Sequence, residues 1–83
     1  MTREEAKAII ASECLIGYRF FENRPYKADE VVVEQTDKKY VVYVTSERCA
    51  RMDESLFEYD TESEALEDFI GRLRADKELR ELL

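Results

Sequence analysis

Residues 30–47 read EVVVEQTDKKYVVYVTSE, two apolar runs separated by a short polar break. The runs Val31–Val33 and Tyr40–Val44 contain only valine and tyrosine, which favour a pleated and partly buried backbone. Thr36–Lys39 is polar and short enough for the chain to reverse, so this stretch predicts a β-hairpin. Because a two-stranded hairpin is only marginally stable in water, the rest of the chain must extend or cover it.

The second run of the hairpin is apolar on both faces. Residues 40, 42 and 44 point to one face of an extended strand, and residues 41 and 43 point to the other. Since all five are valine or tyrosine, the pattern predicts a central strand. Its tyrosines predict that the face without helices stays partly exposed to water.

Further strands are expected on either side of the hairpin. Tyr18–Glu22 is rich in aromatic residues and predicts a first strand. Asn23–Pro25 ends it, because proline lacks the N–H that a β-ladder needs. Residues 49–59 predict a last strand with Leu56 and Phe57 as its apolar part. This last segment has two alternatives, a strand with a bulge or a long loop followed by a short strand.

Two amphipathic helices flank the strands in the sequence. The first opens with a capping box, Thr2 to Glu5, has apolar residues at helical spacing over about 13 residues, and is expected to end at Gly17. The second opens with a capping box from Thr61 to Glu64, and its apolar residues recur at positions 65, 66, 69, 70 and 73. The leucines at 79, 82 and 83 fall off this stripe, which predicts a bend or restart near residues 75–76.

These elements predict an α+β fold, with residues 1–83 as a single domain. Strands joined by short turns pair antiparallel, and two amphipathic helices need the same apolar face. We therefore expect an antiparallel sheet of three or four strands with the N- and C-terminal helices packed on one face. No apolar run approaches the roughly 20 residues of a membrane span, and the N-terminus lacks the features of a secretory signal, so we expect a cytoplasmic protein.

The chain has few of the residues that catalysis uses. It contains no histidine, which removes the commonest general base and zinc ligand, and its two glycines form no phosphate-binding loop. We expect no enzymatic activity, no cofactor and no metal. Cys14 and Cys49 are expected to be free thiols that behave as small apolar residues, with a disulfide between them as the open alternative.

The negative charge is concentrated in one stretch. The chain carries 20 acidic and 13 basic residues, for a net charge of −7, and residues 53–71 contain eight acids and no base. Glu62 and Glu64 suit the positive end of a helix, but the acids at 53, 54, 58 and 60 precede the helix. A local excess of this kind attracts a basic partner and argues against direct binding of nucleic acid.

Three segments resemble a family of small immunity proteins that accompany bacterial polymorphic toxins. They are TREEA at residues 2–6, YVVYVTSERCA at residues 40–50 and EALEDFIGRLR at residues 64–74. The fifty-ninth immunity-protein family is the one that the chain resembles, and residues 18–26 and 51–58 depart from its pattern. The resemblance implies a cytoplasmic protein that binds one toxin domain and neutralises it.

The expected partner is therefore a cognate protein toxin, such as a basic nuclease, and neither nucleic acid nor membrane; the chain itself is expected to be a monomer or weak dimer. Acids of the charged stretch and nearby tyrosines are the candidate contact residues, because acids attract Lys and Arg and tyrosine is enriched at interface hot spots. The candidates are Glu47, Asp53, Glu54, Glu58, Asp60, Tyr43 and Tyr59.

Two other functions fit the same sequence. One is a phage-encoded inhibitor of the anti-CRISPR type, in which the acids imitate nucleic-acid phosphates. The other is a non-enzymatic adaptor whose acids only increase solubility and which associates with itself through the hairpin edge or the terminal leucines.

Overall fold

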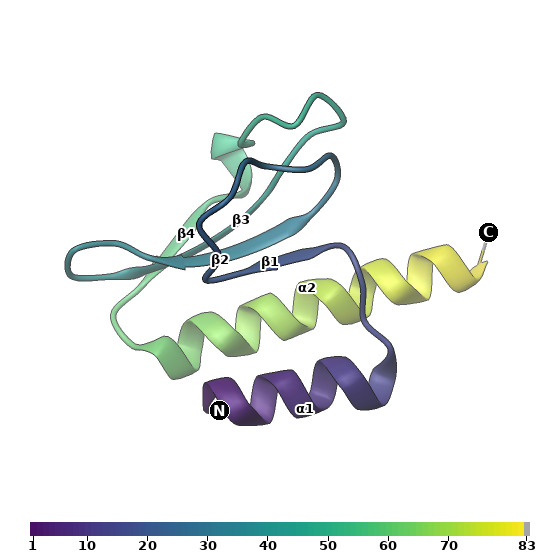
Figure 1. The fold of residues 1–83 in the computed structure, drawn as a ribbon, viewed down its shortest axis with the longest axis horizontal. Coiled ribbons are helices and arrows are strands. Elements are labelled where there is room, and N and C mark those ends of the chain that lie inside the picture. The colour runs from purple at the N-terminus through teal and green to yellow at the C-terminus, as the bar shows by residue number, and fades with distance from the viewer. Residues whose placement is uncertain (83) are drawn as a thin grey trace.

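The computed structural model describes residues 1–82 and has an α+β fold (Figure 1). Four strands form one sheet in the order β1-β2-β3-β4. Both helices lie on the same face of this sheet, as the sequence predicts; α2 packs on the strands and α1 packs beside α2 (Figure 1). The elements in chain order are α1 (Arg3–Glu13), β1 (Tyr18–Phe20), β2 (Val31–Gln35), β3 (Tyr40–Val44), the 3₁₀ turn η1 (Asp53–Ser55), β4 (Phe57–Tyr59) and α2 (Glu62–Leu82).

The predicted hairpin is confirmed. Strands β2 and β3 pair antiparallel with Val33 opposite Val42, and the Thr36 N–H donates to the Lys39 carbonyl at 2.8 Å to close the turn. Strand β3 also pairs antiparallel with β4, so it is a central strand as its two apolar faces predict. Residues 49–59 adopt the second of the two alternatives, a loop with one 3₁₀ turn followed by a short strand.

The expectation of an entirely antiparallel sheet is wrong at β1. Strand β1 runs parallel to β2, with Tyr18 opposite Val31 and Phe20 opposite Val33. The expectation assumed a short turn between them, but residues 21–30 form a connection long enough to return the chain to the start of β1. Two bonds extend the parallel ladder, from the Val31 N–H to the Gly17 carbonyl at 2.9 Å and from the Phe21 N–H to the Val33 carbonyl at 3.0 Å.

Helix α1 begins as predicted, but its left-handed cap is Cys14, three residues before Gly17. The Thr2 hydroxyl accepts from the Glu5 N–H at 3.2 Å, and the Glu5 carboxylate accepts from the Thr2 N–H at 3.0 Å, which completes the capping box. The helix ends at Glu13, the capping residue Cys14 has a left-handed φ of 54°, and the Leu15 N–H then bonds to the Ile10 carbonyl. This pattern terminates a helix even without glycine at the left-handed position.

Helix α2 is continuous, so the predicted bend near residues 75–76 is wrong. The Thr61 hydroxyl accepts from the Glu64 N–H at 3.3 Å at its start, as the predicted cap requires. Leu79 and Leu82 are 60% and 82% exposed because the last turns extend beyond the sheet, where no apolar stripe is needed. Leu83 lies outside the described residues. Neither helix has a stretch apolar enough, over a sufficient length, to cross a bilayer within the described chain.

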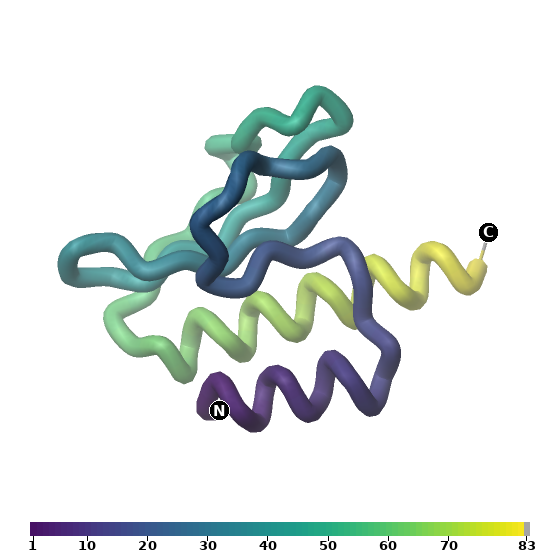
Figure 2. The backbone as a smooth tube through the Cα atoms, in the orientation of Figure 1, coloured from purple at the N-terminus to yellow at the C-terminus, as the bar shows by residue number. Residues whose placement is uncertain are grey.

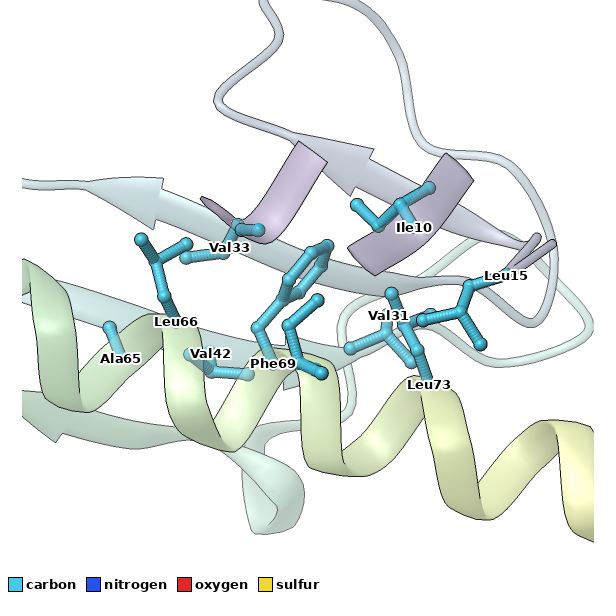
Figure 3. Close-up of a cluster of buried hydrophobic side chains, with 11 residues drawn as sticks. Ile10, Leu15, Val31, Val33, Val42, Ala65, Leu66, Phe69 and Leu73 are labelled. Atoms are coloured by element: carbon cyan, nitrogen blue, oxygen red, sulfur yellow. The ribbon is translucent and has the colours of Figure 1, made fainter. Parts of the chain in front are cut away.

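The main core lies between the helices and the sheet (Figure 3). All five apolar positions predicted for α2 are buried there against Val31, Val33 and Val42 of the hairpin. Phe69 is fully buried, and its ring centroid lies 6.3 Å from that of Tyr18 and 5.7 Å from that of Phe20. This cluster joins both helices to the first three strands.

The opposite face of the sheet is covered over its centre, while Glu34 is half-buried and Glu58 is exposed on it, so this face is partly wet, as expected. The connection formed by residues 21–30 crosses this face (Figure 2), and Tyr26 packs edge-on against Tyr43 with ring centroids 6.0 Å apart. Val32, Val41 and Tyr43 are buried beneath it. On this face, a connection without helix or strand thus covers the apolar side chains that a second layer of helices would otherwise cover.

Candidate functional site

The segment before α2 folds onto the edge of the sheet opposite β1. The turn η1 is closed by the bond from the Leu56 N–H to the Asp53 carbonyl at 3.1 Å. The Ser55 hydroxyl anchors it by accepting from the Val44 N–H at 3.0 Å and by donating to the Met52 carbonyl. Strand β4 then pairs with β3 and leads directly into α2, so the acidic stretch becomes an ordered edge of the molecule.

All five predicted contact acids lie on the surface, but in two groups. Glu47 is in the loop that follows β3, whereas four others lie along η1, β4 and the residue after β4. We call these four acids together with Phe57 the β4 surface; it consists of Asp53, Glu54, Phe57, Glu58 and Asp60. The segment thus brings four of the predicted acids together and leaves Glu47 in a separate loop.

The fold compensates part of the charge that the sequence concentrates in residues 53–71. Four of the eight acids form ion pairs with bases that lie outside residues 53–71. The pairs are Asp53–Arg51 at 2.7 Å, Asp60–Lys39 at 2.9 Å, Glu62–Arg3 at 2.7 Å and Asp68–Arg72 at 2.9 Å. Within residues 1–82, Glu54, Glu58, Glu64 and Glu67 form no ion pair. The uncompensated charge is therefore about half of what the sequence indicates, and two of its four members lie on the β4 surface.

The predicted role of Tyr43 as a contact residue is wrong for this fold. Its side chain is fully buried under Tyr26, since the connection 21–30 covers the face on which it lies. The Tyr43 hydroxyl donates to Glu34 Oε1 at 2.9 Å and accepts from the Tyr26 hydroxyl at 2.7 Å. Burial and these bonds raise its pKa far above the ordinary value, so Tyr43 is a neutral core residue.

Tyr59 is half-buried and links β4 to α2. Its hydroxyl donates to Asp68 Oδ2 at 2.6 Å, and this bond together with burial raises the pKa of Tyr59 to about 12. Asp68 is held in turn by Arg72, whose Nε and Nη2 donate to its two carboxylate oxygens at 2.9 and 3.1 Å. Tyr59 therefore positions the edge strand, and only part of its ring is available to a partner.

Phe57 is the residue that sequence reasoning missed. The sequence predicts Phe57 as half of the apolar part of the last strand, together with Leu56, but the residue is 58% exposed. Leu56 and Phe57 are adjacent and point to opposite faces. The Arg72 guanidinium lies over the ring of Phe57, with Cζ 5.5 Å from the ring centroid. Two adjacent apolar residues in a short edge strand were the available signal, because they point to opposite faces and an edge strand is covered less than a central one.

The remaining sequence candidates for chemistry do not assemble into a site. Cys14 and Cys49 are free thiols, as expected, and both are exposed. No three His, Cys, Asp or Glu side chains among residues 1–82 are placed to hold a metal ion.

No protein-family model, curated protein or solved structure matches this chain. The exposed acids and the exposed aromatic side chain of the β4 surface are therefore the features that bear on function.

Proposed function

We propose that this chain is an immunity protein, a non-enzymatic cytoplasmic inhibitor that binds a cognate bacterial toxin domain. The β4 surface is its contact region, and the partner surface is basic. The observation that carries this proposal is one ordered edge on which Phe57 is exposed on one face of β4 and the acids Glu58 and Asp60 are exposed on the other, with Asp53 and Glu54 exposed just before the strand. An apolar residue within a charged rim is the common arrangement of specific protein interfaces.

The bases in the ion pairs at this surface can be replaced by bases of a toxin. Arg51–Asp53 and Lys39–Asp60 are exposed pairs, of the kind that contributes only about 0–1 kcal/mol each to stability. A toxin lysine or arginine can replace Arg51 or Lys39 at small cost, whereas Glu54 and Glu58 are free to accept one directly. The summed negative field also increases the association rate with a basic surface.

The test combines capture with matched charge reversals. The chain is immobilised, passed over lysate of its source cells, and the retained protein is identified by mass spectrometry and purified. Its association rate is then measured with the wild type and with a variant in which Asp53, Glu54, Glu58 and Asp60 are all lysine. The control variant reverses four exposed acids elsewhere, Glu4, Asp37, Glu67 and Glu78, and has the same net charge.

We expect the first variant to associate with the toxin at least about tenfold more slowly than the control variant. We also expect the association rate of the wild type to decrease as the salt concentration is raised from about 50 to about 500 mM. Equal rates for the two variants would rule out the β4 surface. A retained toxin domain supports the immunity function, while a retained CRISPR effector would support the anti-CRISPR alternative instead.

Self-association is a second candidate because one apolar patch is exposed at the other end of the molecule. Ile16 is 59% exposed and shares a shallow surface hollow with Leu79, which is 60% exposed; Leu82 follows one turn later. If this patch joins two copies, sedimentation at micromolar concentration gives a dimer that becomes monomeric in the Leu79→Ala, Leu82→Ala double variant. A wild-type monomer under the same conditions contradicts this candidate.

A further inference from the structure

The two edges of the sheet differ in whether their outward backbone groups are used. At β1, the Tyr18 carbonyl accepts from Arg24 Nη2 at 3.1 Å, and the Phe20 N–H donates to Glu22 Oε2 at 2.8 Å. Glu22 and Arg24 are themselves paired at 3.0 Å. These two side chains therefore occupy the edge of β1 and prevent another strand from adding there.

The edge of β4 has no such cover. On the side of β3 that faces η1 and β4, the Val44 carbonyl accepts from the Met52 N–H, and the Val44 N–H donates to the Ser55 hydroxyl. On the side that faces β2, the Thr45 N–H donates to the Glu30 carbonyl. The backbone N–H and C=O groups of successive residues in a strand point alternately to its two sides, so those of Tyr40 and Val42 point toward β4. The backbone groups of their partners, Tyr59 and Phe57, therefore point back toward β3. The N–H and C=O of Glu58 therefore point outward, and no side chain among residues 1–82 bonds to them.

The side chains around this free edge define what can add to it. Glu58 and Asp60 project on one face of β4, and the exposed ring of Phe57 projects on the other. An added strand with lysine or arginine on the first face and an aliphatic residue on the second would complement both. A second copy of this chain would not, because pairing β4 with itself places like charges opposite each other.

We propose that β4 binds an extended, basic segment of the partner protein as a fifth strand of the sheet. This inference rests on the proposed function and specifies its contact mode, since main-chain bonds to Glu58 would supply affinity and the flanking side chains would supply selectivity. Because β4 is short, its free edge consists of the backbone N–H and C=O of one residue, Glu58. Side-chain contacts at Phe57, Glu58 and Asp60 therefore contribute much of the binding.

The first experiment uses end-capped peptides and the full chain labelled for NMR. The probe is the heptapeptide KVKVKVK; the controls are EVEVEVE, with opposite charge, and KVKPKVK, with the same charge but without the central N–H. We expect KVKVKVK to shift the amides of Phe57–Tyr59 and to slow hydrogen exchange at Glu58 about tenfold, and to bind at least about tenfold more tightly than either control. Equal binding of KVKPKVK, or unchanged exchange at Glu58, would overturn the inference.

The second experiment uses the variant Glu58→Pro, which removes the outward N–H and is compatible with an edge strand. Glu58→Gln is the matched control, because it loses the same charge but keeps the N–H. If Glu58→Pro remains folded by thermal unfolding, we expect it to bind KVKVKVK at least about tenfold more weakly than Glu58→Gln does. If it does not fold, the comparison of KVKVKVK with KVKPKVK on the wild type decides the inference alone.

The two proposals fail in different ways. A captured toxin that loses affinity on charge reversal but binds Glu58→Pro and Glu58→Gln equally would overturn the strand addition and leave the immunity function in place. Peptide binding at β4 combined with capture of an unrelated basic protein would support the strand addition and overturn the immunity function.

Discussion

Glu30 shows how a buried charge is satisfied in this small chain. The residue is only 2% exposed, yet its carboxylate accepts from Arg24 at 3.0 and 3.2 Å and from the Lys27 N–H at 2.9 Å. Its backbone N–H donates to the Thr45 hydroxyl at 2.9 Å. Burial raises the pKa of Glu30, but the bonds to Arg24 and Lys27 outweigh it, so the pKa lies below the ordinary value.

We expect Glu30→Gln to lower the free energy of unfolding by about 2 kcal/mol at pH 7, because it leaves Arg24 without its buried charged partner. A lowered folded-state pKa adds stability above the unfolded value of 4.5, and this contribution is lost as the pH falls through the folded value. The difference between wild type and variant should therefore shrink at pH 3. Urea unfolding at both pH values measures it, with the exposed Glu4→Gln as control. A difference that is equal at pH 3 and pH 7 would contradict this assignment.

At the scale of the elements, Gly71 is a weak point in the middle of α2. It is exposed, and a Cβ added there would have no heavy atom within 4 Å. Glycine costs about 1 kcal/mol relative to alanine inside a helix, because its backbone loses more freedom on folding. Nothing in the packing around Gly71 requires that cost.

We therefore expect Gly71→Ala to raise the free energy of unfolding by about 1 kcal/mol, measured by urea or thermal unfolding. Gly17→Ala is the contrasting variant, since Gly17 has a φ of 75° and alanine is strained in that region. It should lower stability by about 1 kcal/mol or more. The same sign for both substitutions would show that backbone conformation does not account for these glycines.

At the scale of the whole molecule, stability depends on one core that all larger elements share. Phe69 from α2 contacts rings of β1 and lies in the same cluster as Ile10 of α1 and Val33 of β2 (Figure 3). A domain of this size has a total stability of about 5–15 kcal/mol, and loss of a buried phenylalanine costs about 3–5 kcal/mol.

We expect Phe69→Ala to lower the free energy of unfolding by about 3–5 kcal/mol and to be partly unfolded at 37 °C if the total stability is near about 5 kcal/mol. The matched control is Phe57→Ala, which removes the same atoms from a largely exposed position and should cost less than about 1 kcal/mol. Circular dichroism with urea unfolding compares the two. Equal losses would mean that Phe57 belongs to the core, which would also remove it from the β4 surface.

The features that the sequence predicts correctly are those set by spacing over a few residues. The β2–β3 hairpin follows from two apolar runs around a short polar turn. The start of α1 follows from a capping box, and the buried side of α2 from its apolar positions at helical spacing. These patterns depend on φ/ψ preferences and on which side chains share a face, and both are local properties of the chain.

Other features depend on segments that meet only in the folded molecule. The connection 21–30 makes β1 parallel to β2 and buries Tyr43 beneath Tyr26, which removes Tyr43 from the candidate surface. The distant bases Arg3 and Lys39 pair with two of the acids that the sequence groups together, Glu62 and Asp60. Phe57 is exposed because its strand forms the edge of the sheet. Charge compensation and burial are set by distances between atoms in space, so the sequence by itself determined the elements and their faces, and the tertiary structure decided which charges and side chains remain on the surface.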